Sequence, residues 1–473
     1  MAVNPYHFYN LILLTETLFL RHNTLTKILY KTAFMKKHFL LLLFTFLLFS
    51  TAFSQLPFTA GNLVIYKVGN GTDTLSSAGF QVNLEEFTAT GSFVQSHPMP
   101  TVVVGSNKRI IASGSASSEG QIARSVDKRF LLVTGYDTII DPAKLSLSGS
   151  PSVKVNRVVG IIGADGVIDA TTALADSYGG NNFRGAASTN GTDLWLAGTA
   201  SSSINGGVRY TTKGATTAKR LSSTVTNIRA VAIYNGQLYC STGSGNFKAV
   251  SAVGTGLPVD SPQVITVLPG FPTTSATGGD PYMFSINPTG NLAYVADNRS
   301  KQNGGGIQKW AFNGATWNLQ YTLDSGLTAG LRNIVVNWSG TNPTIYAISG
   351  DPVVKDLPGN KFLKLVDIDS MSAFAVLAIA PVNTIFRGIS FAPENAVVAT
   401  TYTFTGNGLW SQAANWAGNA VPPLLLPSAA AIIINHIVGG QCQLNVSQRI
   451  QPGARLTVNT GKNLIVQGSL TIQ

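Results

Sequence analysis

The 473-residue sequence has few of the side chains that form disulfides, metal sites and catalytic centres. It holds two cysteines, Cys240 and Cys442, and only two histidines beyond residue 54, His97 and His436. The members of each pair fall in different predicted domains. We therefore expect no disulfide between the cysteines. We also expect no site that needs histidine beside its partners, such as a Ser-His-Asp triad or a multi-histidine metal site.

Charged residues are scarce as well, at 11% of the chain, while 44% of residues are hydrophobic and 48 are glycine. A disordered chain would be rich in charge and poor in apolar residues, so this composition predicts a folded protein. The net charge is +11, of which residues 1–54 contribute +4, so the remainder carries 11 − 4 = +7. No basic stripe is visible, and we expect no nucleic-acid partner. An anionic polysaccharide outside the cell stays open as a partner.

Motifs for known catalytic chemistry are missing too. No G-x-S-x-G, H-E-x-x-H, P-loop or dinucleotide motif stands in a strand–turn–helix context. Carboxylates number only 21, and Asp127, Asp137, Asp141 and Asp297 lie beside predicted strands. Such loops can hold Ca²⁺, although Asp more commonly caps turns. We predict no cofactor or metal site, with Ca²⁺ as an unsupported option. A propeller hydrolase or lactonase, with a metal or acidic site at the channel mouth, is the enzymatic alternative.

The N-terminal part of the chain has the pattern of a secretory signal peptide over residues 35–54. Met35-Lys36-Lys37 precedes an apolar core at residues 39–49, and Ala52-Phe53-Ser54 gives a small-x-small cleavage site. The apolar core is shorter than the ~20 residues that span a bilayer. We interpret residues 1–34 as an extension from a misassigned start, with a genuine long leader as the alternative. The pattern predicts a secreted or cell-surface protein without a membrane span after signal removal.

The most informative feature that is present is a repeat. Residues 183–198 read as two apolar runs joined by an Asn-Gly turn, the signature of a β-hairpin. Weaker copies start near residues 124, 184, 229, 283, 332 and 387, in steps of 60, 45, 54, 49 and 55 residues. Periods of roughly 40–50 residues with several strands each are typical of β-propeller blades.

The last copy of the repeat, at residues 386–391, has one inner strand and then stops. We predict that this strand pairs with N-terminal strands, the first of them at residues 62–68, and so closes the ring within one shared blade. Five internal blades plus the shared one give six. Seven blades would result if residues 157–162 and 166–168 belonged to an extra blade. The predicted fold is therefore an all-β propeller over residues 55–393.

A different pattern follows a linker at residues 394–400. Short alternating apolar runs at residues 401–473 are separated by Gly453, Gly461 and Gly468, which predicts a β-solenoid-like module, with a small β-sandwich as the alternative. The pattern is unfinished at the last residue, so this module is either small and capped or truncated. Trp410 and Trp416 flank a polar stretch, where they would either stack on a carbohydrate or cap the end of the solenoid.

Several segments carry a resemblance to a known group. Residues 61–71 (GNLVIYKVGNG), 118–137 (SEGQIARSVDKRFLLVTGYD) and 386–393 (FRGISFAP) resemble uncharacterised secreted bacterial β-propeller proteins. Residues 405–416 (TGNGLWSQAANW) and 453–472 look like β-solenoid segments appended to large bacterial surface proteins. The resemblance implies an architecture and an extracellular location. No activity is settled for that group, so it implies no catalytic residue.

An arginine recurs at the start of the inner strand in five of the repeats: Arg124, Arg184, Arg229, Arg332 and Arg387. Equivalent positions on inner strands form a ring, so five guanidinium groups would make a positive funnel for a carboxylate, sulfate or phosphate. The repeat at Tyr282-Met283 lacks the arginine and interrupts the ring. The structural alternative is that each arginine binds loop carbonyls or an acid of the next blade.

These observations favour a secreted binding or scaffolding protein. It would use the axial face of its propeller to bind an extracellular ligand or partner, with an anion as the favoured class. Two alternatives stay open beside it, the hydrolase or lactonase and a purely structural cell-surface protein whose tail assembles with others. Fold alone does not decide among them.

Overall fold

The computed structural model describes residues 56–141, 143–144, 146–274, 278–352, 354–395 and 400–472. The predicted signal peptide at residues 35–54 and the extension at residues 1–34 lie outside the described residues. Within the described part, secondary structure consists of β-strands and five short 3-10 helices. No helix in that part is long and apolar enough to cross a membrane.

The strands from Leu63 to Phe391 form six four-stranded blades. The blade that contains both ends of the propeller has β25 (Ile385–Phe391), β1 (Leu63–Val68), β2 (Gly79–Phe87) and β3 (Phe93–Pro98). The next has β5 (Ala123–Arg124), β6 (Phe130–Tyr136), β7 (Arg157–Gly163) and β8 (Ile168–Leu174). Strand β4 (Ile111–Ser113) pairs with both β2 and β6, and so joins these two blades into one nine-stranded sheet.

The other four blades are separate antiparallel sheets. They are β9 (Phe183–Ala187), β10 (Asp193–Gly198), β11 (Arg209–Thr212) and β12 (Lys219–Arg220); β13 (Ala230–Tyr234), β14 (Gln237–Thr242), β15 (Ala249–Val253) and β16 (Ile265–Val267); β17 (Pro281–Ile286), β18 (Leu292–Asp297), β19 (Gly306–Phe312) and β20 (Trp317–Leu323); and β21 (Leu331–Asn337), β22 (Thr344–Ser349), β23 (Lys361–Val366) and β24 (Ala375–Ile379). Three 3-10 helices, η1 (Ser203–Asn205), η2 (Gly245–Phe247) and η3 (Lys301–Asn303), lie in the connections.

The inner strands form a closed ring. Strands β5, β9, β13, β17, β21 and β25 each contact the next, and β25 contacts β5 again. The ring is closed by β1, which pairs antiparallel with β25 from Leu63↔Phe391 to Val68↔Ile385. The predicted β-propeller and its closure by the N-terminal and C-terminal strands are therefore confirmed. Residues 157–162 and 168 lie in β7 and β8 of an ordinary blade, so they add no seventh blade.

Local sequence explains the hairpins within the blades. In the hairpin of β13 and β14, Tyr234 pairs with Gln237 across the two-residue turn Asn235-Gly236. Both turn residues have positive φ, 50° and 72°, which is the conformation of the type I′ turn that suits Asn-Gly. Apolar side chains then fill the spaces between blades. Phe271 stacks on Trp310 with ring centroids 4.0 Å apart, in a core that spans three blades.

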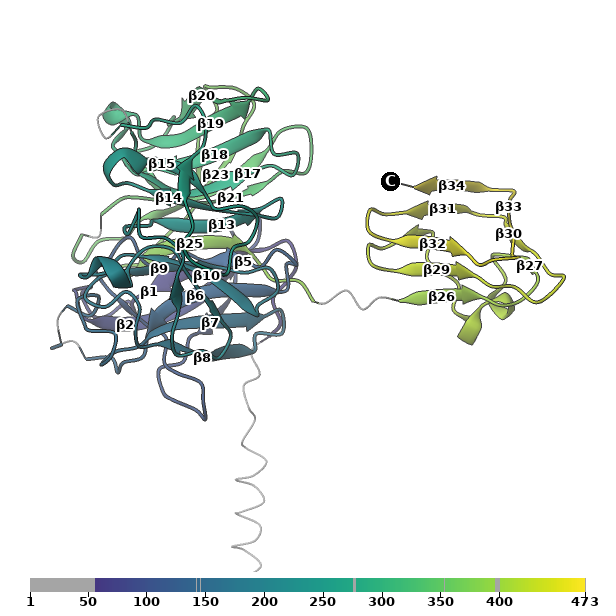
Figure 1. Ribbon diagram of the computed structural model, residues 1–473, viewed down its shortest axis with the longest axis horizontal. Helices are drawn as coiled ribbons and strands as arrows, with labels where there is room; N and C mark the ends of the chain where they lie inside the picture. Colours follow the sequence, from purple (N-terminus) through teal and green to yellow (C-terminus); the bar gives the residue numbers. More distant parts are fainter. Residues whose placement is uncertain are drawn as a thin grey trace, which may run out of the picture. The chain divides into compact units, whose positions relative to one another are not determined.

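The C-terminal residues form three parallel sheets, and successive strands enter each sheet in turn (Figure 1). The sheets are β26 (Thr401–Phe404), β29 (Ala431–Ile434) and β32 (Arg455–Val458); β27 (Gly408–Leu409), β30 (Cys442–Leu444) and β33 (Leu464–Val466); and β28 (Leu425–Leu426), β31 (Ser447–Ile450) and β34 (Ser469–Ile472). Helices η4 (Ala413–Asn415) and η5 (Ala417–Asn419) lie within the first coil. All the strand pairs listed here are parallel. This is the geometry of a β-solenoid and not of an antiparallel sandwich.

Cys240 and Cys442 are both free and buried, and burial raises the pKa of each thiol to about 12. Cys240 lies in β14 and Cys442 in β30. The absence of a disulfide between them agrees with the sequence analysis, and both behave as small apolar core residues.

Candidate functional site

Four of the five recurring arginines lie where inner strands begin. Arg184 is the second residue of β9, Arg229 directly precedes β13, Arg332 is the second residue of β21, and Arg387 is the third residue of β25. Their charges act on one another. Burial lowers the pKa of Arg184 to about 10 with a smaller contribution from the charge of Arg229, and burial likewise lowers the pKa of Arg387, to which Arg332 adds. The structure therefore brings four guanidinium groups to one end of the propeller axis.

Arg124 does not lie at the same level along the axis as the other four arginines. The amide of Gln121, three residues earlier, donates to the carbonyl of Arg184 at 3.0 Å, and the amide of Val126 donates to the carbonyl of Ser188 at 3.0 Å. Gln121 therefore occupies the level of Arg184, and Arg124 lies three residues further along. Aligning the repeats by their letters puts Arg124 at the level of Arg184. The backbone hydrogen bonds of Gln121 and Val126 show that this level is wrong.

Arg124 ties the closing strand in place. Its Nη1 donates to the carbonyl of Ala392 at 3.0 Å and to Oε1 of Glu394 at 2.8 Å. The amide of Glu394 also donates to the carbonyl of Lys128 at 2.9 Å. These bonds fix the residues that follow β25 against those that follow β5. A structural role therefore accounts for the contacts of Arg124 at this position.

Arg387 is buried and bound by loop carbonyls. Its two Nη atoms donate to the carbonyls of Ala116 at 2.6 Å, Ser113 at 2.6 Å and Gly114 at 3.1 Å. Its residue exposure is only 4%. The guanidinium therefore holds the loop after β4 against β25. This is the structural role that the sequence analysis gave as the alternative to ligand binding. It is not accessible to an external ligand.

Arg184 is buried to the same degree. Its Nη1 donates to Oδ1 of Asn227 at 2.7 Å and to the carbonyl of Ile228 at 2.7 Å, both at the start of the next blade. Its Nε donates to Oγ of Ser118 at 3.1 Å. Arg184 therefore connects neighbouring blades beneath the surface of this end.

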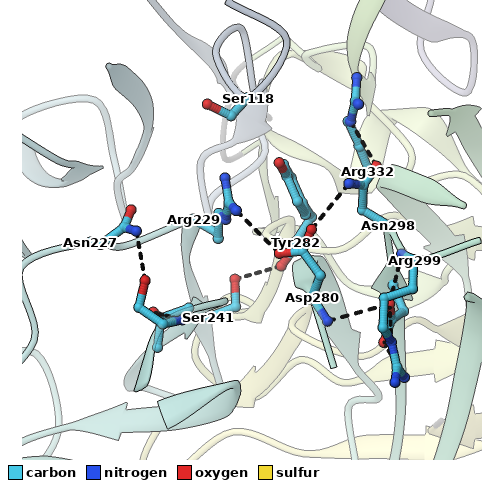
Figure 2. Close-up of polar contacts among 12 residues, drawn as sticks. Ser118, Asn227, Arg229, Ser241, Asp280, Tyr282, Asn298, Arg299 and Arg332 are labelled. Atoms are coloured by element: carbon cyan, nitrogen blue, oxygen red, sulfur yellow. Dashed lines mark hydrogen bonds and ion pairs between the residues drawn. The ribbon is translucent and has the colours of Figure 1, made fainter. Parts of the chain in front are cut away.

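Arg229 and Arg332 are partly exposed at this end, and Figure 2 shows both with their polar partners. Nη2 of Arg229 lies 3.2 Å from Oδ1 of Asp280. Nε of Arg332 donates to Oδ1 of Asn298 at 2.8 Å, and Nδ2 of Asn298 donates to Oδ2 of Asp280 at 3.1 Å. Asp280 and Asn298 thus stand between the two arginines. We call Arg229, Asp280, Asn298 and Arg332 the arginine site.

Tyr282 occupies the place where the repeat lacks an arginine. The guanidinium of Arg229 lies over its ring, 4.6 Å from the centroid (Figure 2). A cation–π contact of this kind orients the guanidinium without neutralising it. Nε of Arg229 is buried and makes no hydrogen bond among the described residues. Tyr282 therefore holds Arg229 in place from the apolar side of the arginine site.

Two carboxylates that the sequence analysis did not single out lie among the arginines. Asp280 directly precedes β17. Glu119 is 3% exposed and lies 3.9 Å from Nη1 of Arg387. Four guanidinium groups against these two acids leave a formal charge of 4 − 2 = +2 at this end. Asp280 could have been found from the sequence, because it directly precedes the inner strand β17, just as Arg229 directly precedes β13.

The aspartates considered for Ca²⁺ are engaged elsewhere. Asp127 pairs with Arg129 at 2.7 Å, Asp137 with Arg109 at 3.0 Å, and Asp297 with Arg299 at 2.8 Å. Asp141 accepts a hydrogen bond from the amide of Ala143 at 3.0 Å. Over the described ranges, no group of three or more His, Cys, Asp or Glu is arranged to hold a metal ion.

The two tail tryptophans form part of the solenoid core. Trp410 is 0% exposed and Trp416 is 2% exposed, and their rings pack edge to face with centroids 4.8 Å apart. Nε1 of Trp416 donates to the carbonyl of Trp410 at 2.7 Å. No ring face is open to stack on a carbohydrate. The burial fits the other role considered for these tryptophans, that of packing over the first coil.

Both histidines of the described chain are buried in their own domains. His97 stacks on Phe58, with ring centroids 4.0 Å apart. In His436, Nδ1 is 2.9 Å from the carbonyl of Ile437, and Nε2 accepts a hydrogen bond from the amide of Asn463 at 2.9 Å. These contacts give His436 a structural role between successive coils.

Comparison with known proteins gives only distant structural neighbours. No protein-family model matches the chain, and no curated protein matches it. Among solved structures, the periplasmic gluconolactonase of Pseudomonas aeruginosa is 12% identical with a TM-score of 0.38, over 70% of this chain and 99% of that one. A GH74 enzyme of Niastella koreensis is 12% identical with a TM-score of 0.33, over 71% of this chain and 44% of that one. At these identities and TM-scores, the two neighbours carry no argument about this chain.

Proposed function

We propose that this protein binds an anionic ligand at the arginine site and that it is a binding protein rather than an enzyme. The observation that supports this most directly is the incomplete pairing of Arg229 and Arg332. In the described chain, the Arg332 guanidinium uses only Nε, and the Arg229 guanidinium has Asp280 as its one acidic partner. Both groups therefore keep donors that match a carboxylate, sulfate or phosphate.

The charge of the surroundings supports the same class of ligand. Arg184 and Arg387 lie buried behind the surface pair and lose much of their hydration. Four positive charges facing two carboxylates create a positive potential, which an anion would relieve. A neutral ligand would leave this potential uncompensated. We therefore favour an anion, with an acidic polysaccharide as the extracellular polymer that offers many such groups.

The experiment is a thermal-shift screen of the chain from residue 55 with sulfate, phosphate, citrate and oligogalacturonate, beside Ca²⁺ and neutral sugars. A ligand at 100 times its Kd adds about 2.7 kcal/mol to the unfolding free energy, which raises the Tm visibly. We expect a shift with anions that is lost in Arg332→Gln. Arg109→Gln is the matched control, because Arg109 pairs with Asp137 outside the arginine site.

Other outcomes would contradict anion binding at this site or favour one of the two alternative functions. A shift specific to Ca²⁺ or another divalent metal, with turnover of a sugar lactone, would support the hydrolase or lactonase. No shift across the panel would contradict anion binding and favour the purely structural surface protein. An anion shift of equal size in Arg332→Gln and the unchanged protein would contradict the arginine site as its location.

We further propose that the protein acts outside the cytoplasm. The basic residues, apolar core and small-x-small sequence of residues 35–54 support this. Expression in a bacterial host and sequencing of the purified N-terminus test it. We expect a mature chain that begins at Gln55, and retention of residues 35–54 in a cytoplasmic product would contradict the proposal.

A further inference from the structure

The end of the axis where the inner strands finish contains a cavity. Its volume is about 540 Å³, and all six inner strands contribute to its wall. Residues of the turns after these strands, including Lys128, Asn235, Pro288 and Trp338, line it as well. The cavity therefore lies at the opposite end of the inner strands from the arginine site. Its volume is within the range of about 300–1,000 Å³ that small-molecule sites occupy.

The wall of the cavity is mostly apolar. Apolar residues from several blades line it, and Val126, Ile233, Pro288 and Val335 among them keep exposed surface. Some of the serine hydroxyls in the wall already take part in hydrogen bonds. Oγ of Ser285, for example, accepts a hydrogen bond from Nε1 of Trp338 at 3.1 Å. Burial of an apolar body against such a wall is favourable because it removes apolar surface from water.

The charges at the cavity are of one sign. Its described lining residues include Arg124 and Lys128 and no carboxylate. Glu394 lies outside the lining and pairs with Arg124 at 2.8 Å, while its distance to Nζ of Lys128 is 4.0 Å. Two cations and one carboxylate leave 2 − 1 = +1. The side chain of Lys128 is 57% exposed, so its ammonium group is free to meet a ligand.

The rim also carries aromatic surface. Trp338 stacks on Tyr294 with ring centroids 5.3 Å apart, and the OH of Tyr234 donates to the carbonyl of Phe284 at 2.7 Å. These contacts hold both rim residues, Trp338 and Tyr234, while each stays partly exposed. The rim is therefore a fixed, partly apolar opening and not a loose loop.

We infer that this cavity binds a small amphipathic monoanion, a free carboxylic acid with an apolar body. The apolar body would fill the aliphatic wall, and the carboxylate would lie at the rim beside Lys128. The single excess positive charge matches one carboxylate, while the apolar wall disfavours sugars and polyanions. This site is independent of the arginine site, and each can fail without the other.

The test compares octanoate with 1-octanol, two molecules with the same chain length that differ in charge. Binding to the chain from residue 55 is followed by isothermal titration calorimetry. We expect octanoate to bind about two- to fivefold more tightly than 1-octanol, the range for a partly exposed charge pair. Lys128→Gln should remove that difference and leave 1-octanol binding unchanged.

Two variants locate the site. Ala123 is partly exposed and lines the cavity, so Ala123→Phe should fill it and abolish binding of both molecules. The Tm of this variant shows whether it still folds. If the Ala123→Phe variant does not fold, the fluorescence of Trp338 is measured instead. Octanoate should then change the emission of the unchanged protein, and Trp338→Phe should lose that change. Arg109→Gln, at an ion pair outside both the cavity and the arginine site, is the control and should bind octanoate normally.

Three results would overturn the inference. Absence of binding by both molecules would show a solvent-filled channel only. Equal affinities for octanoate and 1-octanol would contradict the monoanion. Octanoate binding that persists in a folded Ala123→Phe protein, or with no change in Trp338 emission, would place the molecule elsewhere.

Discussion

The carboxylate of Asp280 lies between two partly exposed arginines of the propeller axis, 3.2 Å from Nη2 of Arg229 and linked through Asn298 to Arg332. Asp280 thus gives Arg229 a carboxylate contact of the kind that we propose for the anionic ligand. It holds Arg229 in position while the site is free. A ligand that enters the site has to share Arg229 with this carboxylate or displace it.

The first prediction follows from that competition. Asp280→Asn keeps the hydrogen-bonding shape beside Asn298 but removes the negative charge. Anion affinity should therefore rise by about two- to fivefold, which corresponds to the free energy of a partly exposed ion pair. Titration calorimetry with sulfate measures it. Weaker binding in Asp280→Asn would show that the carboxylate helps to form the site rather than to block it.

A second prediction concerns the buried Arg387. Arg387→Met leaves three loop carbonyls without their donor and Glu119 without its nearby cation. Breaking a buried ion pair by removing one partner costs about 3–5 kcal/mol. Urea unfolding should show a loss of this size, and Arg387→Met combined with Glu119→Gln should recover part of it. A loss of less than about 1 kcal/mol would mean that Arg387 is not the fastener described here.

The third prediction tests the ring closure. Strand β1 pairs with both β25 and β2, so it has no free edge. Val64→Pro removes a backbone donor from this central strand and should cost about 3 kcal/mol or more. Val94→Pro, in the edge strand β3, is the matched control and should cost much less. Equal Tm losses for the two variants would contradict closure through β1.

A fourth prediction concerns stability at low pH. Burial acts to raise the pKa of Asp351, but hydrogen bonds from Ser349 and Thr328 and the charge of Lys361 outweigh it, so the pKa is lowered. A lowered carboxyl pKa stabilises the fold above the unfolded value of about 3.9 and loses this contribution as pH falls further. Asp351→Asn should therefore destabilise the protein at pH 7 and flatten the stability curve below pH ~4. Asp73→Asn, in an exposed loop, is the control.

The fifth prediction separates the two roles considered for the tail tryptophans. Trp410→Ala empties a buried site in the solenoid core, and such a change costs about 3–5 kcal/mol. Hydrogen exchange in β26 and β29 of the full chain should become faster. Binding of sugars should stay unchanged, because the indole has no exposed face. Faster exchange together with lost sugar binding would contradict the purely structural role.

The sequence predicts the architecture well because the relevant signals are local. The Asn235-Gly236 turn fixes a hairpin by its own backbone preference. The unfinished repeat at residues 386–391 requires a partner strand, and the structure supplies β1. Parallel pairing in the tail was harder to foresee, since short apolar runs with glycine corners fit both a solenoid and a sandwich.

The candidate site is predicted only in part, because burial depends on packing between blades. Arg184 and Arg332 hold the same place in their repeats, yet Arg184 is covered by the loop that carries Ser118 and Arg332 is not. The level of Arg124 was misjudged because backbone pairing, and not letter spacing, sets the register. The axial cavity arises from six strands together, so no single repeat contains its signal.

The measurement that tests the central proposal most directly is a crystal structure of the chain from residue 55 soaked with selenate, an anomalously scattering analogue of sulfate. We predict an anomalous peak beside Arg229 and Arg332, with selenate oxygens at hydrogen-bond distance, about 3 Å, from their guanidinium nitrogens. We also expect the peak to disappear in Arg332→Gln crystals. A saturated soak with no peak at the arginine site, or with peaks only at other arginines such as Arg449, would contradict anion binding there.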